Sequence, residues 1–324
     1  MSKHISIYCT LGPSSLNKKF LLFTNNKVDL LRINMSHVQA EDLENIIKYI
    51  RKYSKVPICI DTEGAQIRTK VKLKNKIKKN QKIKIFRKGG NFNLYPDIVF
   101  SKLKLNDILE LGFEGLVAVV KKKTNSSIVL VCKSSGILET NKGVHVKNRT
   151  IKLEYLTTKD VKAINLAKKL NINDFALSFT NTKEDMIKFN KLLNKNNKIF
   201  KLETMKALKS FNSLNKYGKD FLIDRGDLSK SISIEKIPLA QRYLFKEKNK
   251  DTRISVATNF LESMINNPFP TRAEVNDIFN SMEMGANGLV LAAETAIGKY
   301  PIECISFLRK MIVVFNKKNE ISFK

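Results

Sequence analysis

The feature that most constrains the fold is a repeated alternation of short apolar runs with helical patterns. Near the start of the chain, strands are predicted at residues 5–9, 28–33 and 56–60, with helices at 14–23 and 40–53 between them. This spacing indicates right-handed βαβ units that build a buried parallel sheet. The alternation returns after residue 150, where further strands are predicted at 174–178, 198–202, 220–223, 254–257 and 288–291.

Helices fill the intervals between these later strands, notably at residues 183–193, 237–246, 272–284 and 302–315. Three strands in the first part and five in the second make eight β/α repeats, the count of an α/β (β/α)8 TIM barrel. A doubly wound open sheet is the alternative, but no G-x-G-x-x-G follows the first strand. We therefore predict the barrel.

The alternation of strands and helices is interrupted between residues 70 and 146. There the chain is rich in lysine and β-branched residues, as in VKLKNKIKKNQKIKIF. Turn signals occur at Gly89-Gly90 and Asn125-Ser126, and there is no clear amphipathic helix. We predict a small β-rich lid domain inserted after the third strand. The catalytic barrel would then consist of residues 1–69 and 147–324.

The charge balance is unusual, because 59 Lys and Arg against 30 Asp and Glu leave a net charge of +29. Such a surface attracts nucleic acid, anionic membranes or phosphorylated metabolites without choosing among them. The lysines accompany many asparagines and isoleucines throughout the chain, which is typical of AT-rich coding, so we expect no specific nucleic-acid partner. The four isolated cysteines and the lack of a signal peptide or a membrane-length apolar run predict a cytoplasmic protein with no membrane contact.

Polar residues follow nearly every predicted strand at its carboxyl end, where barrel enzymes place their chemistry. These residues are Arg32, Asn34 and Ser36 after the second strand, Asp61 and Thr62 after the third, and Lys201, Glu203, Arg225, Gly226, Asp227, Thr258, Glu294 and Thr295 after the last four. Each of these residues also has a purely structural explanation, such as an ion pair for Lys201 with Glu203 or a helix cap for Thr258. For the site to have no function, all of these structural explanations would have to be correct at once, at the same end of the same barrel.

The residue types indicate the chemistry. Glu203 and Asp227 offer hard oxygen ligands on neighbouring strands, which suits Mg2+ or Mn2+. Lys201 precedes Glu203 by two residues and so lies on the same side of its strand. Arg32 can bind a phosphate through two hydrogen bonds. A lysine and a metal ion at one point stabilise negative charge on a phosphoryl or enolate oxygen, so the predicted substrate is a small, phosphorylated anion.

At these residues the sequence resembles pyruvate kinase. CTLGPSS is similar to C-T-I-G-P-A-S, LLRINMSH to A-R-L-N-F-S-H, IDTEGAQIRT to L-D-T-K-G-P-E-I-R-T, and NKGVHV to K-K-G-V-N-L. FKLET resembles S-K-I-E-N, and DRGDL resembles A-R-G-D-L. The longest similar stretch, residues 256–301, keeps N-F-L-E-S-M, N-P-x-P-T-R-A-E-V and E-T-A-x-G-x-Y-P in order. The resemblance covers nearly the whole chain.

The resemblance implies a glycolytic enzyme that transfers the phosphoryl group of phosphoenolpyruvate to ADP, giving pyruvate and ATP. Lys201, Thr258 and Arg32 would be catalytic. The implied contacts are Arg32, Lys201, Gly226, Asp227 and Thr258 for the substrate, Glu203 and Asp227 for Mg2+, Asn34, Ser36, Asp61 and Thr62 for K+, and Asn34, His37, Arg68 and Lys142 for the nucleotide.

The sequence also departs from the family's pattern. The stretch LELGFEG, residues 109–115, stands where the family has an Asp-Asp-Gly that helps close over the nucleotide. Gln66 replaces a glutamate that influences the need for K+, which leaves K+ dependence open. The chain ends at Lys324, so we expect the family's C-terminal regulatory domain and its effector control to be absent, and a homodimer to form through barrel surfaces.

Three functional hypotheses follow. The first is a pyruvate kinase reduced to its catalytic part, including the case of weakened activity. The second is a related barrel that performs another metal-dependent reaction on phosphoenolpyruvate or a pyruvate enolate. The third is a basic binding or assembly module without catalysis, against which the complete set of metal-binding carboxylates argues.

Overall fold

The computed structural model describes residues 4–112 and 115–320. It divides into two compact units, the first made of residues 1–64 and 158–324 and the second of residues 65–157. The insert expected at residues 70–146 falls within the second unit. Among the described residues, every helix is too short or too polar to cross a lipid bilayer.

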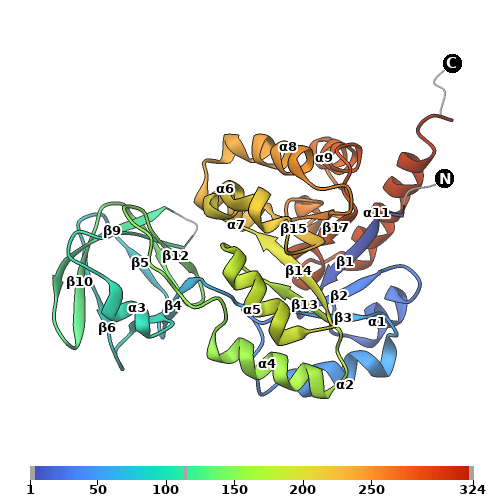
Figure 1. Cartoon of the computed structure of the whole chain (residues 1–324). Helices are drawn as coiled ribbons and strands as arrows, with labels where there is room; N and C mark the ends of the chain where they lie inside the picture. Colours follow the sequence, from blue (N-terminus) through green and yellow to red (C-terminus); the bar gives the residue numbers. More distant parts are fainter. Residues whose placement is uncertain (1–3, 113–114, 321–324) are drawn as a thin grey trace. The chain divides into compact units, whose positions relative to one another are not determined.

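The first unit is a closed barrel of eight parallel strands in the order β1-β17-β16-β15-β14-β13-β3-β2. This confirms the predicted fold class, and Figure 1 shows the strands surrounded by helices. The strands are β1 (Ser6–Thr10), β2 (Leu30–Asn34), β3 (Ile58–Asp61), β13 (Asp174–Leu177), β14 (Asn197–Leu202), β15 (Asp220–Asp224), β16 (Arg253–Ala257) and β17 (Gly288–Leu291).

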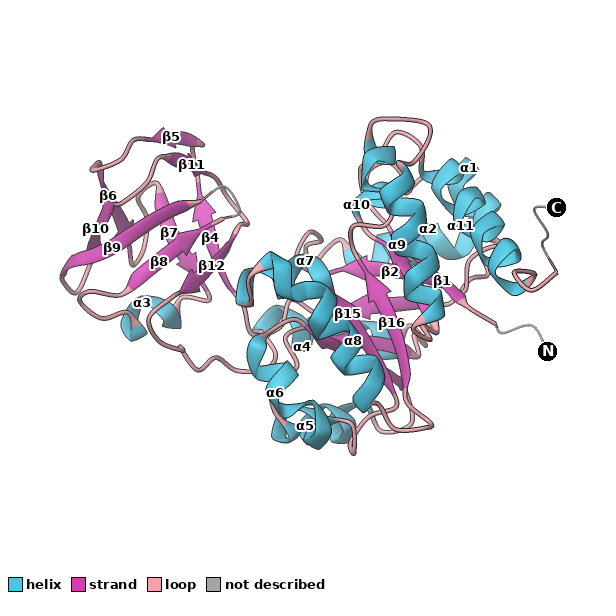
Figure 2. Cartoon of the chain, turned by 90° about the horizontal axis from the view of Figure 1, so that it is seen from above, coloured by secondary structure: helices cyan, strands magenta, loops and turns pink. Residues whose placement is uncertain are grey.

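Helices cover the outside of this barrel, as the cyan ribbons around the magenta strands of Figure 2 show. They are α1 (Lys18–Thr24), α2 (Leu43–Tyr53), α4 (Thr158–Lys169), α5 (Lys183–Leu193), α6 (Met205–Leu214), α7 (Arg225–Ser231), α8 (Ile237–Glu247), α9 (Arg272–Glu283), α10 (Ala293–Ala296) and α11 (Pro301–Asn316).

The barrel strands are buried on both faces, which is why they read as continuous apolar runs in the sequence. One set of side chains fills the interior and includes Leu30, Cys59, Ala176, Leu222 and Val290. The outward set packs against the helices. All four cysteines of the chain are free and buried, so no disulfide contributes to the fold.

Two helices begin later than the sequence predicted. Helix α1 begins at Lys18 rather than at residue 14, because the side chain of Asn17 caps it by accepting a hydrogen bond from the Phe20 amide. Helix α2 begins at Leu43 rather than at residue 40. In both cases the preceding residues form turns, which periodicity alone does not separate from the first helical turn.

The second unit is built almost wholly of strands. Seven of them form one sheet in the order β6-β10-β9-β8-β12-β4-β7, and β11 pairs with β5 in a second sheet. The elements are β4 (Ile67–Val71), β5 (Asn75–Ile77), β6 (Lys82–Phe86), β7 (Phe92–Tyr95), α3 (Ile98–Lys102), β8 (Ile108–Leu111), β9 (Leu116–Lys123), β10 (Ser127–Cys132), β11 (Gly136–Leu138) and β12 (Gly143–Val146).

Strand β6 explains the lysine-rich stretch of this unit. Ile83 and Ile85 point into the core, whereas Lys82 and Lys84 are exposed. This is the period-two pattern of a strand with one solvated face. The chain then turns back through the pair Gly89-Gly90, where both residues have positive φ angles that glycine adopts without strain.

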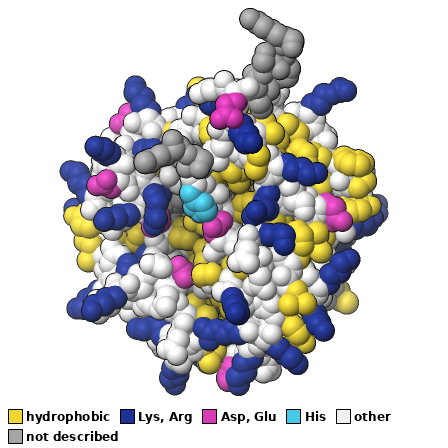
Figure 3. All heavy atoms as spheres, turned by 90° about the vertical axis from the view of Figure 1, so that its right-hand side faces the viewer, with side chains coloured by type: hydrophobic (Ala, Val, Ile, Leu, Met, Phe, Trp, Pro, Cys, Tyr) yellow, Lys and Arg dark blue, Asp and Glu magenta, His cyan; other side chains and the backbone are white. Residues whose placement is uncertain are grey.

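The distribution of positive charge can be followed on one face of the molecule. On the face shown in Figure 3, Lys and Arg side chains are scattered among apolar and neutral ones and do not gather in one basic patch. The third hypothesis, a basic binding module, draws no support from this face.

Aromatic residues tie the barrel to its helices and provide a test of the core. Phe211 of α6 stacks edge-on against Phe221 of β15 at 5.5 Å between ring centroids, and both are fully buried. Phe211→Ala should lower the free energy of unfolding by about 3–5 kcal/mol, because it removes a buried ring and leaves a cavity. Phe269→Ala is the matched control, since Phe269 is 77% exposed. Urea unfolding measures both, and equal losses would contradict this view of the core.

Candidate active site

The polar residues predicted to share one end of the barrel do meet there. Arg32 lies in the middle of β2 and Asn34 ends it, Asp61 ends β3, Lys201 lies near the end of β14, and Thr258 follows β16. The register aligns Asn34 with Asp61 across β2 and β3. Parallel strands in register deliver the residues at their carboxyl ends to the same rim, so side chains far apart in sequence become neighbours.

Lys201 lies at the centre of this rim. Its Nζ is 2.8 Å from Glu203 Oε1, 3.3 Å from Asp61 Oδ2 and 3.4 Å from Asp224 Oδ2. It also donates a hydrogen bond to Ser178 Oγ at 3.2 Å. Burial by itself lowers the pKa of Lys201, but the surrounding carboxylates outweigh it and hold the pKa well above its ordinary value. The group is therefore a permanent ammonium.

Arg32 is the second buried cation. Its Nε donates to Thr10 Oγ1 at 2.9 Å, and its Nη1 lies 3.2 Å from Asp61 Oδ2. Burial lowers the pKa of Arg32, but the nearby carboxylates of Asp61 and Asp224 raise it by more than burial lowers it. The pKa of Arg32 therefore lies above its ordinary value. Two fixed positive charges thus face the rim, where a phosphorylated anion would be bound.

Glu203 is held by the backbone as well as by Lys201. Its Oε2 accepts a hydrogen bond from the Phe179 amide at 2.5 Å, and Phe179 has a positive φ of 52°. Burial raises the pKa of Glu203 to about 8; Lys201 opposes this shift, whereas Asp227 and Asp224 add to it. A left-handed backbone at a bulky residue is uncommon, and here it points the amide at the carboxylate.

Three carboxylates of the rim form a group suited to a cation. One oxygen from each of Glu203, Asp224 and Asp227 lies within 4.8 Å of the others. Glu203 Oε1 is buried without a well-aligned hydrogen bond and faces the ammonium of Lys201, while Asp227 pairs with Lys230. An all-carboxylate set of donors fits a hard divalent ion such as Mg2+ or Mn2+. Glu203 and Asp227, the two metal ligands predicted from the sequence, both belong to this group.

Thr258 occupies a strained position beside Gly226. Its φ is 69°, which a β-branched residue rarely adopts. Its Oγ1 accepts a hydrogen bond from the Gly226 amide at 2.8 Å and donates to the Ala257 carbonyl at 2.6 Å. The guanidinium of Arg225 holds the Thr258 carbonyl through Nε at 3.1 Å. The hydroxyl is thereby fixed at the mouth of the barrel, and it does not cap the next helix.

The loop after β3 fixes Asp61 and Thr62. Asp61 Oδ1 accepts a hydrogen bond from Ser178 Oγ at 3.1 Å, and Thr62 Oγ1 accepts one from the Ser178 amide at 3.0 Å. Gly64 has a φ of 68°, and a Cβ there would lie 2.5 Å from the Ser178 carbonyl oxygen. The buried carboxylate of Asp160 accepts from the amides of Glu63 and Gly64. A side chain at position 64 would therefore displace this loop.

The other two residues predicted to bind K+ lie at the end of β2. Asn34 Oδ1 accepts a hydrogen bond from the Ser36 amide at 3.0 Å, and the Met35 amide donates to the Asp61 carbonyl at 2.9 Å. The first hydrogen bond fixes the side-chain oxygen of Asn34, and the second connects this turn to the backbone of β3. Glu63, which replaces a lysine of the family pattern, pairs with Lys159 at 2.9 Å.

The residues predicted to contact the nucleotide are divided between the units. Asn34 and His37 belong to the barrel, and the His37 amide donates to the Asn34 carbonyl at 3.0 Å. Arg68 and Lys142 belong to the insert, where the register of β4 and β12 aligns Arg68 with Gly143. Lys142 Nζ lies 3.0 Å from Glu139. Residues 113 and 114 of the stretch LELGFEG lie outside the described residues.

Sequence reasoning missed three side chains of the rim. Thr10 ends β1, Ser178 follows β13, and Asp224 ends β15; each contacts Arg32 or Lys201. The signal was present, because the rule that polar residues at strand ends converge applies to all eight strands. The prediction names no polar residue after the first and fourth strands, and after the strand at residues 220–223 it begins with Arg225, which leaves out Asp224.

Glu294 follows β17, is buried, and does not belong to the group of Glu203, Asp224 and Asp227. Its Oε2 accepts a hydrogen bond from the Ala292 amide at 2.7 Å, and it belongs to the short helix α10. Its neighbour Thr295 donates to the Thr10 carbonyl at 2.9 Å, which links the last strand to the first. Burial raises the pKa of Glu294 to about 7.

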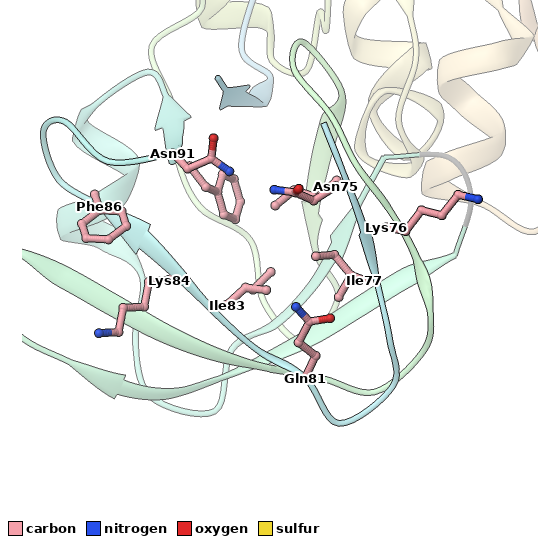
Figure 4. A pocket seen from close by; sticks show the side chains of 10 residues that line it. Asn75, Lys76, Ile77, Gln81, Ile83, Lys84, Phe86 and Asn91 are labelled. Atoms are coloured by element: carbon pink, nitrogen blue, oxygen red, sulfur yellow. The ribbon is translucent and has the colours of Figure 1, made fainter. Parts of the chain in front are cut away.

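A hollow of about 340 Å³ lies in the insert among side chains of β5 and β6, including Ile77, Ile83 and Phe86 (Figure 4). None of the residues predicted to form the site lines it. The candidate active site is therefore the rim of the barrel.

A closed (β/α)8 barrel whose rim holds two buried cations beside a group of carboxylates defines an enzyme for small anionic substrates. The family model described as "Pyruvate kinase, barrel domain" matches residues 2–305. Pyruvate kinases of Thermotoga maritima and Methanocaldococcus jannaschii are each 34% identical, covering 97% and 99% of this chain and 71% of their own length. The pyruvate kinase of Chlamydia muridarum is 29% identical over 96% of the chain. The chain belongs to the pyruvate kinase family and is a phosphotransferase.

The raised pKa of Glu294 predicts a pH-dependent stability. A folded-state pKa of about 7 against an ordinary 4.5 means that the protonated carboxyl favours the folded state, and that this contribution is lost as the pH rises through 7. The free energy of unfolding of the wild type should fall by up to roughly 3 kcal/mol relative to Glu294→Gln between about pH 5 and pH 8. Urea unfolding of both proteins across this range measures it. A constant difference would show that Glu294 is ionised throughout.

Proposed function

We propose that the barrel rim transfers the phosphoryl group of phosphoenolpyruvate to ADP and then lets the enolate take up a proton to give pyruvate. The bond from phosphorus to the enol oxygen breaks, and a bond to a terminal oxygen of ADP forms. The observation that carries the proposal is the buried ammonium of Lys201, held among carboxylates beside the buried guanidinium of Arg32. Family membership supports the same reaction.

Lys201 and Arg32 would act on the substrate's phosphoryl group. Phosphoryl transfer proceeds through a loose transition state, in which positioning and neutralisation of charge contribute most of the rate. A permanent ammonium fixed by several contacts needs little reorganisation when charge develops on the phosphoryl and enolate oxygens. Arg32 is fixed by Thr10 and Asp61, so its remaining N–H groups are oriented in advance.

Gly226 and Thr258 would serve the other end of the substrate. At Gly226 the backbone would approach the substrate carboxylate closely, and Asp227 follows it in the first turn of α7. The Thr258 hydroxyl, held by its contacts to Gly226 and Ala257, would lie on the side of the enolate that receives the proton. The strained φ of Thr258 is consistent with a functional constraint on this residue.

Glu203 and Asp227 would hold a divalent cation, Mg2+ or Mn2+, and Asn34, Ser36, Asp61 and Thr62 would hold K+. The bound cations would neutralise phosphoryl oxygens during the transfer. Arg68, Lys142, Asn34 and His37 would contact ADP. We also propose a homodimer through barrel surfaces, supported by the apolar side chains Ile234 and Leu239, which are 75% and 67% exposed.

Lys201 provides the sharpest test of this function. Lys201→Arg keeps the buried positive charge but moves it, and it should lower ADP-dependent formation of pyruvate by at least about 100-fold while the fold remains. Lys201→Met should be at least as inactive, although it also leaves Asp61, Glu203 and Asp224 without their shared counter-charge. Lys209→Met, at an exposed position of α6, is the control with unchanged activity. Normal turnover by a folded Lys201→Arg protein would show that this site is wrong.

The ion requirements form a separate prediction. Removing divalent ions with a chelator should abolish turnover, and Mg2+ or Mn2+ should restore it. Replacing K+ with Na+ should then lower the rate roughly several-fold, because the oxygens of Asn34, Ser36, Asp61 and Thr62 would be left without an ion of suitable size. Equal rates in K+ and Na+ would remove the K+ site from the proposal, and rates insensitive to the chelator would remove the divalent site.

A further inference from the structure

We propose that Asp224 is a third carboxylate ligand of the divalent cation, beside Glu203 and Asp227. The family pattern A-R-G-D-L has alanine at the position of Asp224. The inference rests on the proposed function, because it concerns the cation used in phosphoryl transfer. It adds to that site a residue that sequence similarity does not assign.

The backbone places Asp224 at the right point. It is the last residue of β15, and the register pairs it with Ala257 of β16. Leu202, just before Glu203, pairs with Ile223, just before Asp224. Glu203 and Asp224 therefore occupy equivalent places on adjacent strands, and both side chains are almost completely buried. Asp227 follows three residues later, in the first turn of α7.

The spacing of the oxygens fits a single small ion. One oxygen from each of Glu203, Asp224 and Asp227 lies within 4.8 Å of the other two. Six oxygens at about 2.1 Å around Mg2+ would lie about 3 to 4 Å from one another. Small rotations of the three side chains would bring their oxygens onto one ion, because all of them already face the same space.

Among the described residues, Asp224 forms its ion pair with Lys201, an ammonium that the closer carboxylates of Glu203 and Asp61 share. Asp224 stands at the N-cap of α7, yet its side chain makes no capping hydrogen bond. Its ion-pair partner is Lys201 at 3.4 Å, whereas Glu203 lies closer to the same ammonium at 2.8 Å. A buried carboxylate is costly unless it is paired or binds a metal.

The charges of the rim also call for a cation. The ammonium of Lys201 is shared among Asp61, Glu203 and Asp224, and Asp61 is further paired with Arg32. Lys201 and Arg32 together carry two positive charges against the three carboxylates, so one negative charge is left over. A divalent ion between Glu203, Asp224 and Asp227 would balance this excess and leave Lys201 to contact the substrate. Three carboxylates should also hold the ion before any substrate supplies oxygens.

The test is a direct measurement of Mn2+ binding to the full chain without phosphoenolpyruvate or ADP, by electron paramagnetic resonance of the free ion. The wild type should bind one Mn2+ per chain. Asp224→Asn, which keeps the shape of the side chain, should bind it about 10- to 100-fold more weakly. Asp224→Ala is the second variant, because it removes the ligand oxygen as well. Circular dichroism checks that each variant is folded.

Asp220→Asn is the matched control. Asp220 lies on the same strand but at its opposite end, where it pairs with Arg253 at 2.5 Å. Its neutralisation removes one negative charge from the chain without touching the rim, so Mn2+ affinity should stay unchanged. Asp227→Asn should lose affinity under the proposed function itself.

The outcomes separate the two proposals. If Asp227→Asn loses Mn2+ while Asp224→Asn and Asp224→Ala bind it as the wild type does, the third ligand is refuted and the proposed cation site stands. If the wild type binds no Mn2+ without substrate, the third ligand is refuted as well, and ADP-dependent turnover then decides the proposed function. Weaker binding by both Asp224 variants, with Asp220→Asn unchanged, supports the inference.

Discussion

The buried ammonium of Lys201 is the interaction on which the rest of the site depends. It faces carboxylates from β3, β14 and β15, and the hydroxyl that follows β13. A charge buried so completely is tolerable only because its partners are fixed around it, and they in turn would repel one another without it. Barrel closure makes this possible, since each strand contributes a residue to one rim. The same contacts of Lys201 therefore both connect strands of the closed barrel and set the charge of the site.

The same rim contrasts with the rest of the molecule in its charge. A chain with a net charge of +29 concentrates four carboxylates, Asp61, Glu203, Asp224 and Asp227, at one end of its barrel. On the face that Figure 3 shows, the lysines are solvated and spread out, so they attract anions only weakly and without direction. In the proposed function, selection of a phosphorylated substrate would fall to the buried cations Lys201 and Arg32, whose positions are fixed. The excess surface charge is thus background to the site.

Much of the barrel could be predicted, and the reason is physical. A parallel strand covered on both faces consists of consecutive apolar residues, so β13 to β17 were located to within a residue or two. Helices α5, α8, α9 and α11 were located by their periodic patterns. The short helix α7 was not, because its first residues, Arg225 to Asp227, are those of a common turn. For the insert, the sequence predicted a β-rich domain but not the bounds or the pairing of its strands. Antiparallel pairing between distant segments produces no local sequence pattern.

The sequence by itself determined the order of strands and helices, the family, and most residue types at the strand ends, because these depend on local pattern and motif. Only the tertiary structure decided which groups meet: Lys201 with Asp61, Arg32 with Thr10, Glu203 with the Phe179 amide, and Asp224 with Lys201. The physical reason is that these contacts follow from barrel closure and register, which join residues as far apart as 140 positions along the chain. No local pattern encodes such a pairing.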